Sequence, residues 1–173
     1  MTRSGKFVED LQTKLNETPA NARYVWKFGD KEKKRNLEWK PGRGERQSVD
    51  LVGEPKRNGP LLLIEVELRR GDPSSNVLKI WLWKCQKKLK GNFILFQAFS
   101  RYYNKKNHTL INRATFLGKR MEKDIEGAKG KYVPIKFHYL PGKSAKAGGG
   151  ARRHRARYLA GRILREMRRL KLA

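Results

Sequence analysis

The chain reads Leu61-Leu62-Leu63-Ile64-Glu65-Val66-Glu67-Leu68 in its most apolar run, and two glutamates lie inside that run. Because the side chains of a strand alternate between its two faces, Glu65 and Glu67 project from one face and the even-numbered residues of 62–68 point into a core. Two like charges on a central strand repel each other and are costly to desolvate. A positive partner must offset that cost, and a divalent cation bound by oxygen ligands does so.

The composition indicates a polyanionic partner. The chain has 173 residues, the size of one domain with an extension, and its 42 Lys and Arg against 16 Asp and Glu give a net charge of +26. A charge this large makes a compact monomer repel itself, so the chain is expected to bind an anion-rich partner. Nucleic acid is the first expectation, an anionic membrane surface the second and a ribosome-like assembly the third.

Cysteine content and hydropathy indicate the compartment. Cys85 is the single cysteine, so no internal disulfide can form, which fits a reducing environment. No stretch approaches the ~18 apolar residues of a membrane span, and the N-terminus lacks the apolar core of a signal peptide. We therefore expect a cytoplasmic protein that associates with nucleic acid and not with a membrane.

Apolar periodicity and turn residues predict an α/β fold with a mixed central sheet flanked by helices. The sequence predicts helices over 5–17, 75–89 and 109–126, and strands over 23–28, 36–40, 47–52, 61–69, 93–99 and 132–139. Pro134 marks the last strand as an edge strand, since proline cannot donate to a ladder. The helix over 75–89 is apolar around most of its circumference, so it is expected in the core, with Cys85, or in a homodimer interface through Trp81 and Trp83.

A change of composition near residue 141 divides the chain. Residues 1–140 are expected to form the α/β domain, residues 141–150 a flexible linker, and residues 151–173 a basic amphipathic helical arm that is ordered on binding. The arm holds nine Arg or Lys and one acid, Glu166.

Three acids are expected to converge. Asp50 belongs to a short strand that precedes the strand carrying Glu65 and Glu67, and two adjacent strands can bring the three carboxylates to one point. Paired carboxylates hold Mg²⁺, which lowers the pKa of a bound water and stabilises charge on a phosphate during transfer. The alternative is a purely structural role, in which these acids form a solvated face or pair with local arginines.

At these residues the chain resembles the PD-(D/E)xK nuclease superfamily, in its E-x-E variant, over roughly residues 5–100. The resemblance implies a restriction-endonuclease-like fold with Mg²⁺ (or Mn²⁺) bound by Asp50 and Glu65. Glu67 stands where the family has a lysine, and it would bind a second metal or orient the attacking water. Lys79 on the following helix would be the migrated lysine that stabilises phosphate charge. Glu9 or Glu17 matches by position the glutamate that many members carry on the first helix.

We therefore expect a metal-dependent endonuclease that hydrolyses phosphodiester bonds, in DNA rather than RNA. Basic side chains are expected to contact phosphates and supply affinity that does not depend on base sequence. These residues are Arg101, Lys105, Lys106, Arg152, Arg153, Arg155 and Arg157. Two rival readings remain: a non-catalytic nucleic-acid-binding protein on the same fold, and a basic assembly protein that binds structured RNA.

Overall fold

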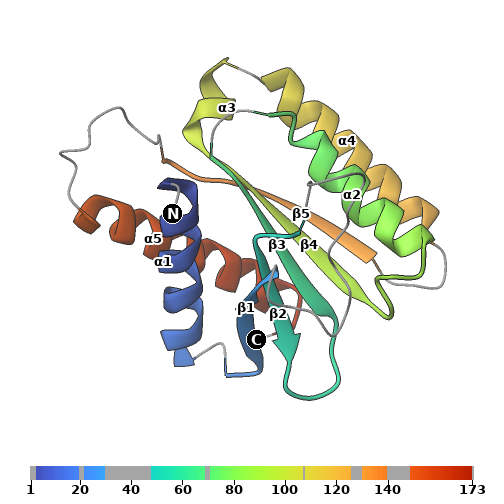
Figure 1. Cartoon of the computed structure of the whole chain (residues 1–173), viewed down its shortest axis with the longest axis horizontal. Helices are drawn as coiled ribbons and strands as arrows, with labels where there is room; N and C mark the ends of the chain where they lie inside the picture. Colours follow the sequence, from blue (N-terminus) through green and yellow to red (C-terminus); the bar gives the residue numbers. More distant parts are fainter. Residues whose placement is uncertain are drawn as a thin grey trace, which may run out of the picture.

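The chain folds into a five-stranded sheet with helices on both faces (Figure 1). The computed structural model describes residues 3–19, 22–29, 48–68, 71–106, 108–125, 130–139 and 149–172. The helices are α1 (Arg3–Glu17), α2 (Ser74–Cys85), α3 (Arg101–Lys106), α4 (His108–Asp124) and α5 (Gly149–Arg169). The strands are β1 (Tyr24–Phe28), β2 (Leu51–Pro55), β3 (Leu61–Glu67), β4 (Phe93–Phe99) and β5 (Gly130–Lys136).

The strands lie side by side in chain order, with β3 at the centre. The pairs β1–β2 and β2–β3 are antiparallel, whereas β3–β4 and β4–β5 are parallel. The parallel pairs require crossovers, and α2 and α4 supply them. This arrangement confirms the predicted α/β class with a mixed sheet flanked by helices, and it confirms that β3 is central and that Pro134 lies on an edge strand.

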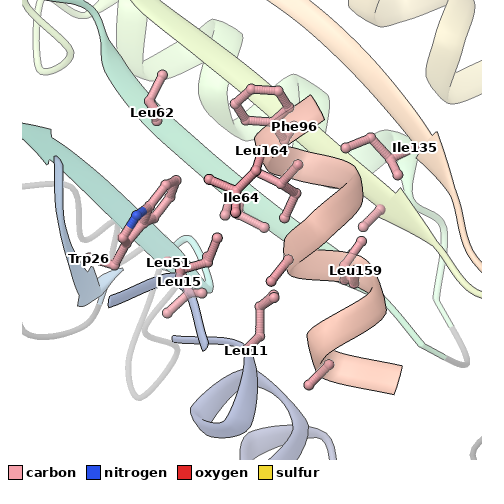
Figure 2. Close-up of a cluster of buried hydrophobic side chains, with 14 of the residues drawn as sticks. Leu11, Leu15, Trp26, Leu51, Leu62, Ile64, Phe96, Ile135, Leu159 and Leu164 are labelled. Carbon is pink, nitrogen blue, oxygen red and sulfur yellow. The ribbon is translucent and has the colours of Figure 1, made fainter. Parts of the chain in front are cut away.

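Two hydrophobic clusters cover the two faces of the sheet. On the first face, α1 and α5 pack against residues that include Leu62, Ile64 and Phe96 (Figure 2). On the second face, α2 and α4 pack against residues that include Leu61 and Leu63. Figure 1 shows α1 and α5 on one side of the sheet and α2 and α4 on the other.

The pleat of β3 divides the apolar run as the sequence predicts. The even-numbered leucine and isoleucine side chains enter the first cluster, and the odd-numbered leucines enter the second. Glu65 and Glu67 share the parity of Leu61 and Leu63, so both glutamates project from the second face, beneath α2. Their burial is nearly complete, with 3% and 7% of their surface exposed.

Helix α5 corrects the expectation of a separate basic arm. Its apolar side is buried in the first cluster, and it packs along α1. The buried residues are Ala156, Leu159, Ala160, Ile163, Leu164 and Met167. An amphipathic helix needs an apolar partner, and the first face of the sheet offers one that α1 alone does not cover. Residues 149–169 therefore belong to the domain core, and residues 141–148 of the predicted linker lie outside the described residues.

Several predicted boundaries move. The strand expected over 47–52 begins at Leu51 and continues to Pro55, so Asp50 lies just before β2 and not within it. The strand expected over 36–40 lies outside the described residues, and the short helix α3 was not predicted.

Cys85 is exposed, not buried, because it stands on the outer side of α2. None of the helices in the described ranges has the length and hydropathy that crossing a membrane requires.

Candidate active site

Asp50 is fixed from two sides at the point where β2 begins. Its main-chain carbonyl accepts a hydrogen bond from the Gly29 amide at 3.3 Å, and its side-chain Oδ2 accepts one from the Val66 amide of β3 at 2.7 Å. A Cβ at residue 29 would lie 2.0 Å from the Val49 carbonyl oxygen, so only glycine allows this approach. The local backbone therefore aims the Asp50 carboxyl at the strand that carries the two glutamates.

Glu65 forms an ion pair with Lys79 of α2. The Lys79 Nζ donates to Glu65 Oε1 at 2.7 Å, and both side chains are at most 5% exposed. The same ammonium lies 5.6 Å from the centroid of the Trp83 ring. Removing both charges from water is costly, and the close contact between them offsets part of that cost.

All three protons of the Lys79 ammonium have acceptors. Besides Glu65 Oε1, its Nζ donates to the Ser48 carbonyl oxygen at 2.8 Å and to Asn76 Oδ1 at 2.9 Å. These three acceptors fix the position of the Lys79 Nζ beside Glu65. The charge of Lys79 acts to lower the pKa of Glu65.

Glu67 is held by two side-chain amides. Its Oε1 accepts hydrogen bonds from Asn76 Nδ2 at 2.9 Å and from Gln97 Nε2 at 2.6 Å. Gln97 lies on β4, is fully buried, and also donates to the Pro73 carbonyl oxygen at 2.7 Å. The Tyr132 hydroxyl on β5 donates to Gln97 Oε1 at 2.8 Å. A buried chain of hydrogen bonds thus runs from β5 through β4 to the glutamate.

Desolvation dominates the acid chemistry of the site. Burial raises the pKa of Asp50 to about 6, although the Val66 amide and the nearby Lys79 act in the opposite direction. Burial raises the pKa of Glu65 to about 8 against the attraction of Lys79, and the charges of Asp50 and Glu67 raise it further. Burial also raises the pKa of Tyr132. Asp50 and Glu65 therefore hold protons more tightly than exposed carboxylates do, and a bound cation would displace them.

Each acid uses one oxygen for a hydrogen bond to the protein. Asp50 Oδ2, Glu65 Oε1 and Glu67 Oε1 are engaged, and among the described residues no hydrogen bond reaches the other oxygen of each. Carboxylate oxygens of this kind are ligands that Mg²⁺ accepts, and Mg²⁺ commonly takes one or two carboxylates together with waters and substrate phosphates. The three acids therefore offer oxygens of the kind that Mg²⁺ accepts.

The described residues nevertheless contain no ready-made cage. No group of three or more His, Cys, Asp or Glu side chains in the described ranges is arranged to hold a metal ion. The position of Lys79 gives a physical reason, since its ammonium occupies the side of Glu65 on which positive charge is needed. A metal that used Glu65 would have to loosen this ion pair.

The structure brings Asp50, Glu65, Glu67 and Lys79 into one cluster on the second face. Sequence reasoning missed Asn76, Gln97 and Tyr132. Gln97 had a usable signal, because it is the polar residue in the otherwise apolar strand 93–99, and Asn76 stands one helical turn before Lys79. Tyr132 had none, since tyrosine in a strand is ordinary. The glutamates proposed from the first helix do not join the cluster, because α1 covers the opposite face of the sheet.

The residues predicted to contact phosphates are scattered. Arg101 is exposed at the start of α3, and the side chains of Lys105 and Lys106 lie outside the description. Arg152 is half-buried and pairs with Asp10 of α1. Arg155 and Arg157 are exposed on α5, as is Arg153, whose Nε donates to the Gly149 carbonyl oxygen at 3.3 Å. The α5 residues belong to a helix on the other side of the sheet from the acids.

Comparison of the chain with family models, with curated proteins and with solved structures finds no significant match to any of them.

Proposed function

We propose that the chain is a metal-dependent endonuclease of the restriction-endonuclease-like kind, with nucleic acid as substrate and DNA as the first form to test. The observation that carries the proposal is the clustering of Asp50 with the buried Glu65 and Glu67 of β3 around Lys79 of α2. Three carboxyl groups are gathered where they destabilise one another, in a protein of net charge +26. Perturbed acids that share a buried site are a mark of function.

In this proposal Asp50 and Glu65 hold Mg²⁺ or Mn²⁺. The ion supplies a bound water of lowered pKa and stabilises charge on the phosphate. Glu67, held by Asn76 and Gln97, orients the water whose oxygen attacks phosphorus, or serves a second ion. Lys79, whose Nζ lies 2.7 Å from Glu65 Oε1, would donate a hydrogen bond to a phosphate oxygen. The attacking water would lose its proton to solvent as its oxygen bonds to phosphorus. The phosphorus–oxygen bond to the leaving strand would break, and the departing oxygen would take a proton from solvent.

The test is cleavage by the purified chain with Mg²⁺ or Mn²⁺, and with EDTA as the blank. Supercoiled plasmid, linear duplex, single-stranded DNA and RNA are offered in turn. Glu65→Gln keeps the size of the side chain and removes its charge, so cleavage should fall by about 100-fold or more while nucleic-acid binding persists. Glu54→Gln is the matched control, because Glu54 pairs with Lys27 elsewhere on the sheet, and it should leave the rate unchanged.

A second candidate is a non-catalytic nucleic-acid-binding protein with the same fold. Its support is the closed Glu65–Lys79 ion pair together with the lack of a ready-made metal group in the described ranges. Tight binding of every nucleic-acid form, with no cleavage under either metal, would select this candidate and reject the nuclease.

A further inference from the structure

The outer side of α5 carries arginines and no acid. Opposite the buried side of the helix, Arg155, Arg157, Arg165, Arg168 and Arg169 are exposed and Arg162 is half-buried. We call these six residues the outer arginine face. They extend from residue 155 to residue 169, about 21 Å at 1.5 Å per residue. His154, Tyr158 and Gly161 lie among them, and the helix has one acid, Glu166, at the margin of this face.

These arginines differ from the basic residues of α4. On α4, Arg113 pairs with Asp72, Lys119 with Glu122 at 2.8 Å, and Arg120 with Asp124 at 3.4 Å. On α5, Arg169 pairs with Glu166 at 2.8 Å, whereas no acid among the described residues pairs with the other five members of the face. Three of the four Arg and Lys residues of α4 thus pair with an acid of the described residues, whereas only one member of the outer arginine face does.

Such an arrangement has a cost within the isolated protein. Arg165 and Arg169 stand four residues apart, and Arg162 and Arg165 three, so their like charges are neighbours on the helix surface. Like charges at this spacing destabilise a helix. Gly161 adds a further cost, since glycine is less favourable than alanine inside a helix. A Cβ at residue 161 would meet no atom within 4 Å, so nothing in the described fold requires glycine there.

A polyanion lying along α5 would account for both features. It would neutralise the arginines, and the missing side chain at Gly161 would let its backbone approach the helix. All eight basic residues of α5 are arginine and none is lysine. Guanidinium groups match the oxygen pairs of phosphates better than ammonium groups do. Tyr158 is the one aromatic side chain on the helix, so the face is no platform for stacking unpaired bases.

The outer arginine face is also distant from the acid cluster. The buried side of α5 faces the first side of the sheet, so its arginines point away from the molecule on that side. The acids project from the second side, beneath α2. The sheet and the thickness of α5, about 10–12 Å with side chains, lie between them (Figure 1).

We propose that the outer arginine face binds the phosphate backbone of a second double-stranded segment, distinct from any strand held at the acid cluster. The molecule would then hold two duplexes at once, one on each side of its sheet. This inference rests on the nucleic-acid binding of the proposed function, but it does not depend on cleavage.

A bridging assay tests it with the full-length chain in EDTA, so that no cutting occurs. A biotinylated duplex is fixed on beads, protein is added, and retention of a second, fluorescent duplex is measured. The wild-type chain should retain it. The triple variant Arg157→Gln, Arg165→Gln, Arg168→Gln should retain at least tenfold less, and the salt slope of its duplex binding should be shallower by about 2.7, or about 0.9 per lost contact.

The matched control removes the same charge from α4. The variant Arg113→Gln, Lys119→Gln, Arg120→Gln should bridge like the wild type, and circular dichroism should show both variants folded. No bridging by the wild type, or equal bridging by the α5 variant, would overturn the proposal. Equal bridging by the α5 variant is also the result expected of a dimer in which each copy binds one duplex at a site outside α5.

Binding to vesicles of phosphatidylserine tests whether the outer arginine face recognises lipid phosphates instead. If the α5 substitutions abolish vesicle binding but leave duplex bridging intact, the face recognises lipid phosphates and the proposal is wrong. A chain that bridges duplexes but never cuts them would reject the nuclease and keep this inference, so the two failures are distinguishable.

Discussion

Glu65 and Asp50 hold protons that free carboxyl groups release, and this would make metal binding by these acids dependent on pH. Their folded pKa values, about 8 and about 6, are above the ordinary values of 4.5 and 3.8. Between the ordinary and the folded pKa the native state binds more protons than the unfolded chain, so these two groups lower the free energy of unfolding as pH rises. A divalent cation competes with those protons and should bind better at high pH.

We therefore expect Mg²⁺ to raise the melting temperature more at about pH 8.5 than at about pH 5.5, and cleavage to rise over the same interval. Thermal unfolding with and without Mg²⁺ measures the difference. Glu65→Gln should remove most of this pH dependence, since one of the two titrating groups is gone. An equal effect of Mg²⁺ at both pH values would contradict the assignment of the cation to these acids.

The hydroxyl of Tyr132 contacts the acid cluster through Gln97. Tyr132→Phe leaves the buried Gln97 Oε1 without that donor, which should cost about 1–2 kcal/mol in the free energy of unfolding. Urea denaturation measures this cost, and Tyr158→Phe on the exposed side of α5 is the control expected near zero. If Gln97 positions Glu67, the same Tyr132 variant should lower the rate of cleavage and leave duplex binding unchanged.

At the scale of single residues, the sequence predicted the acids better than their surroundings. The alternation of β3 put Glu65 and Glu67 on one face, and a strand preceding β3 suggested Asp50 as the third acid. The partners could not be predicted in the same way, because the contact between Gln97 and Glu67 depends on the parallel register of β3 and β4. The exposure of Cys85 was missed because its helix is apolar on nearly every side.

Among the elements, α5 has the role that differs most from its prediction. Leu159 is fully buried in the first cluster, so Leu159→Ala should lower the free energy of unfolding by about 2–5 kcal/mol. Arg157→Ala, two residues away on the exposed side, should change it by less than about 0.5 kcal/mol. Urea denaturation of both variants distinguishes a core helix from an appended arm, for which the two substitutions would have equally small effects.

Deletion of residues 149–173 gives a second measure of the same element. Removing an appended arm would weaken only nucleic-acid binding. Since α5 covers the first face of the sheet with α1, its removal should expose that face and cause unfolding or aggregation. Size-exclusion chromatography and circular dichroism of the shortened chain report the outcome, and a monomeric, fully folded product would contradict the packing described here.

Most elements were predictable because their apolar patterns are long and regular. The strand over 93–99 was predicted with its exact bounds, and the helices α1 and α4 within two residues at each end. β2 was misplaced because Gly53 and Pro55 suggest a turn, although Gly53 sits in the strand where the Trp26 ring needs the space of a missing side chain. The prediction that α5 is a separate arm was wrong because it gave more weight to the high charge of the helix than to its apolar stripe.

At the scale of the whole molecule, net charge limits stability. A charge of +26 on 173 residues makes the folded state repel itself. Raising NaCl from low to moderate concentration should therefore raise the melting temperature, and a short duplex should raise it further at equal ionic strength. At 100 times its dissociation constant a ligand adds about 2.7 kcal/mol to the free energy of unfolding. For the triple α5 variant, the duplex should raise the melting temperature by less than the added salt does.

The pairing of α1 with α5 also affects the timing of folding on the ribosome. Arg152 meets Asp10 across 142 residues of chain, and α5 completes the burial of the apolar side of α1. At a synthesis rate of about 5–20 residues per second, that gap lasts about 7–30 s. During this time the nascent chain exposes the apolar surface of α1 that α5 later covers. Chaperones that bind such surfaces on nascent chains should therefore affect the yield of native protein more strongly than any single surface substitution.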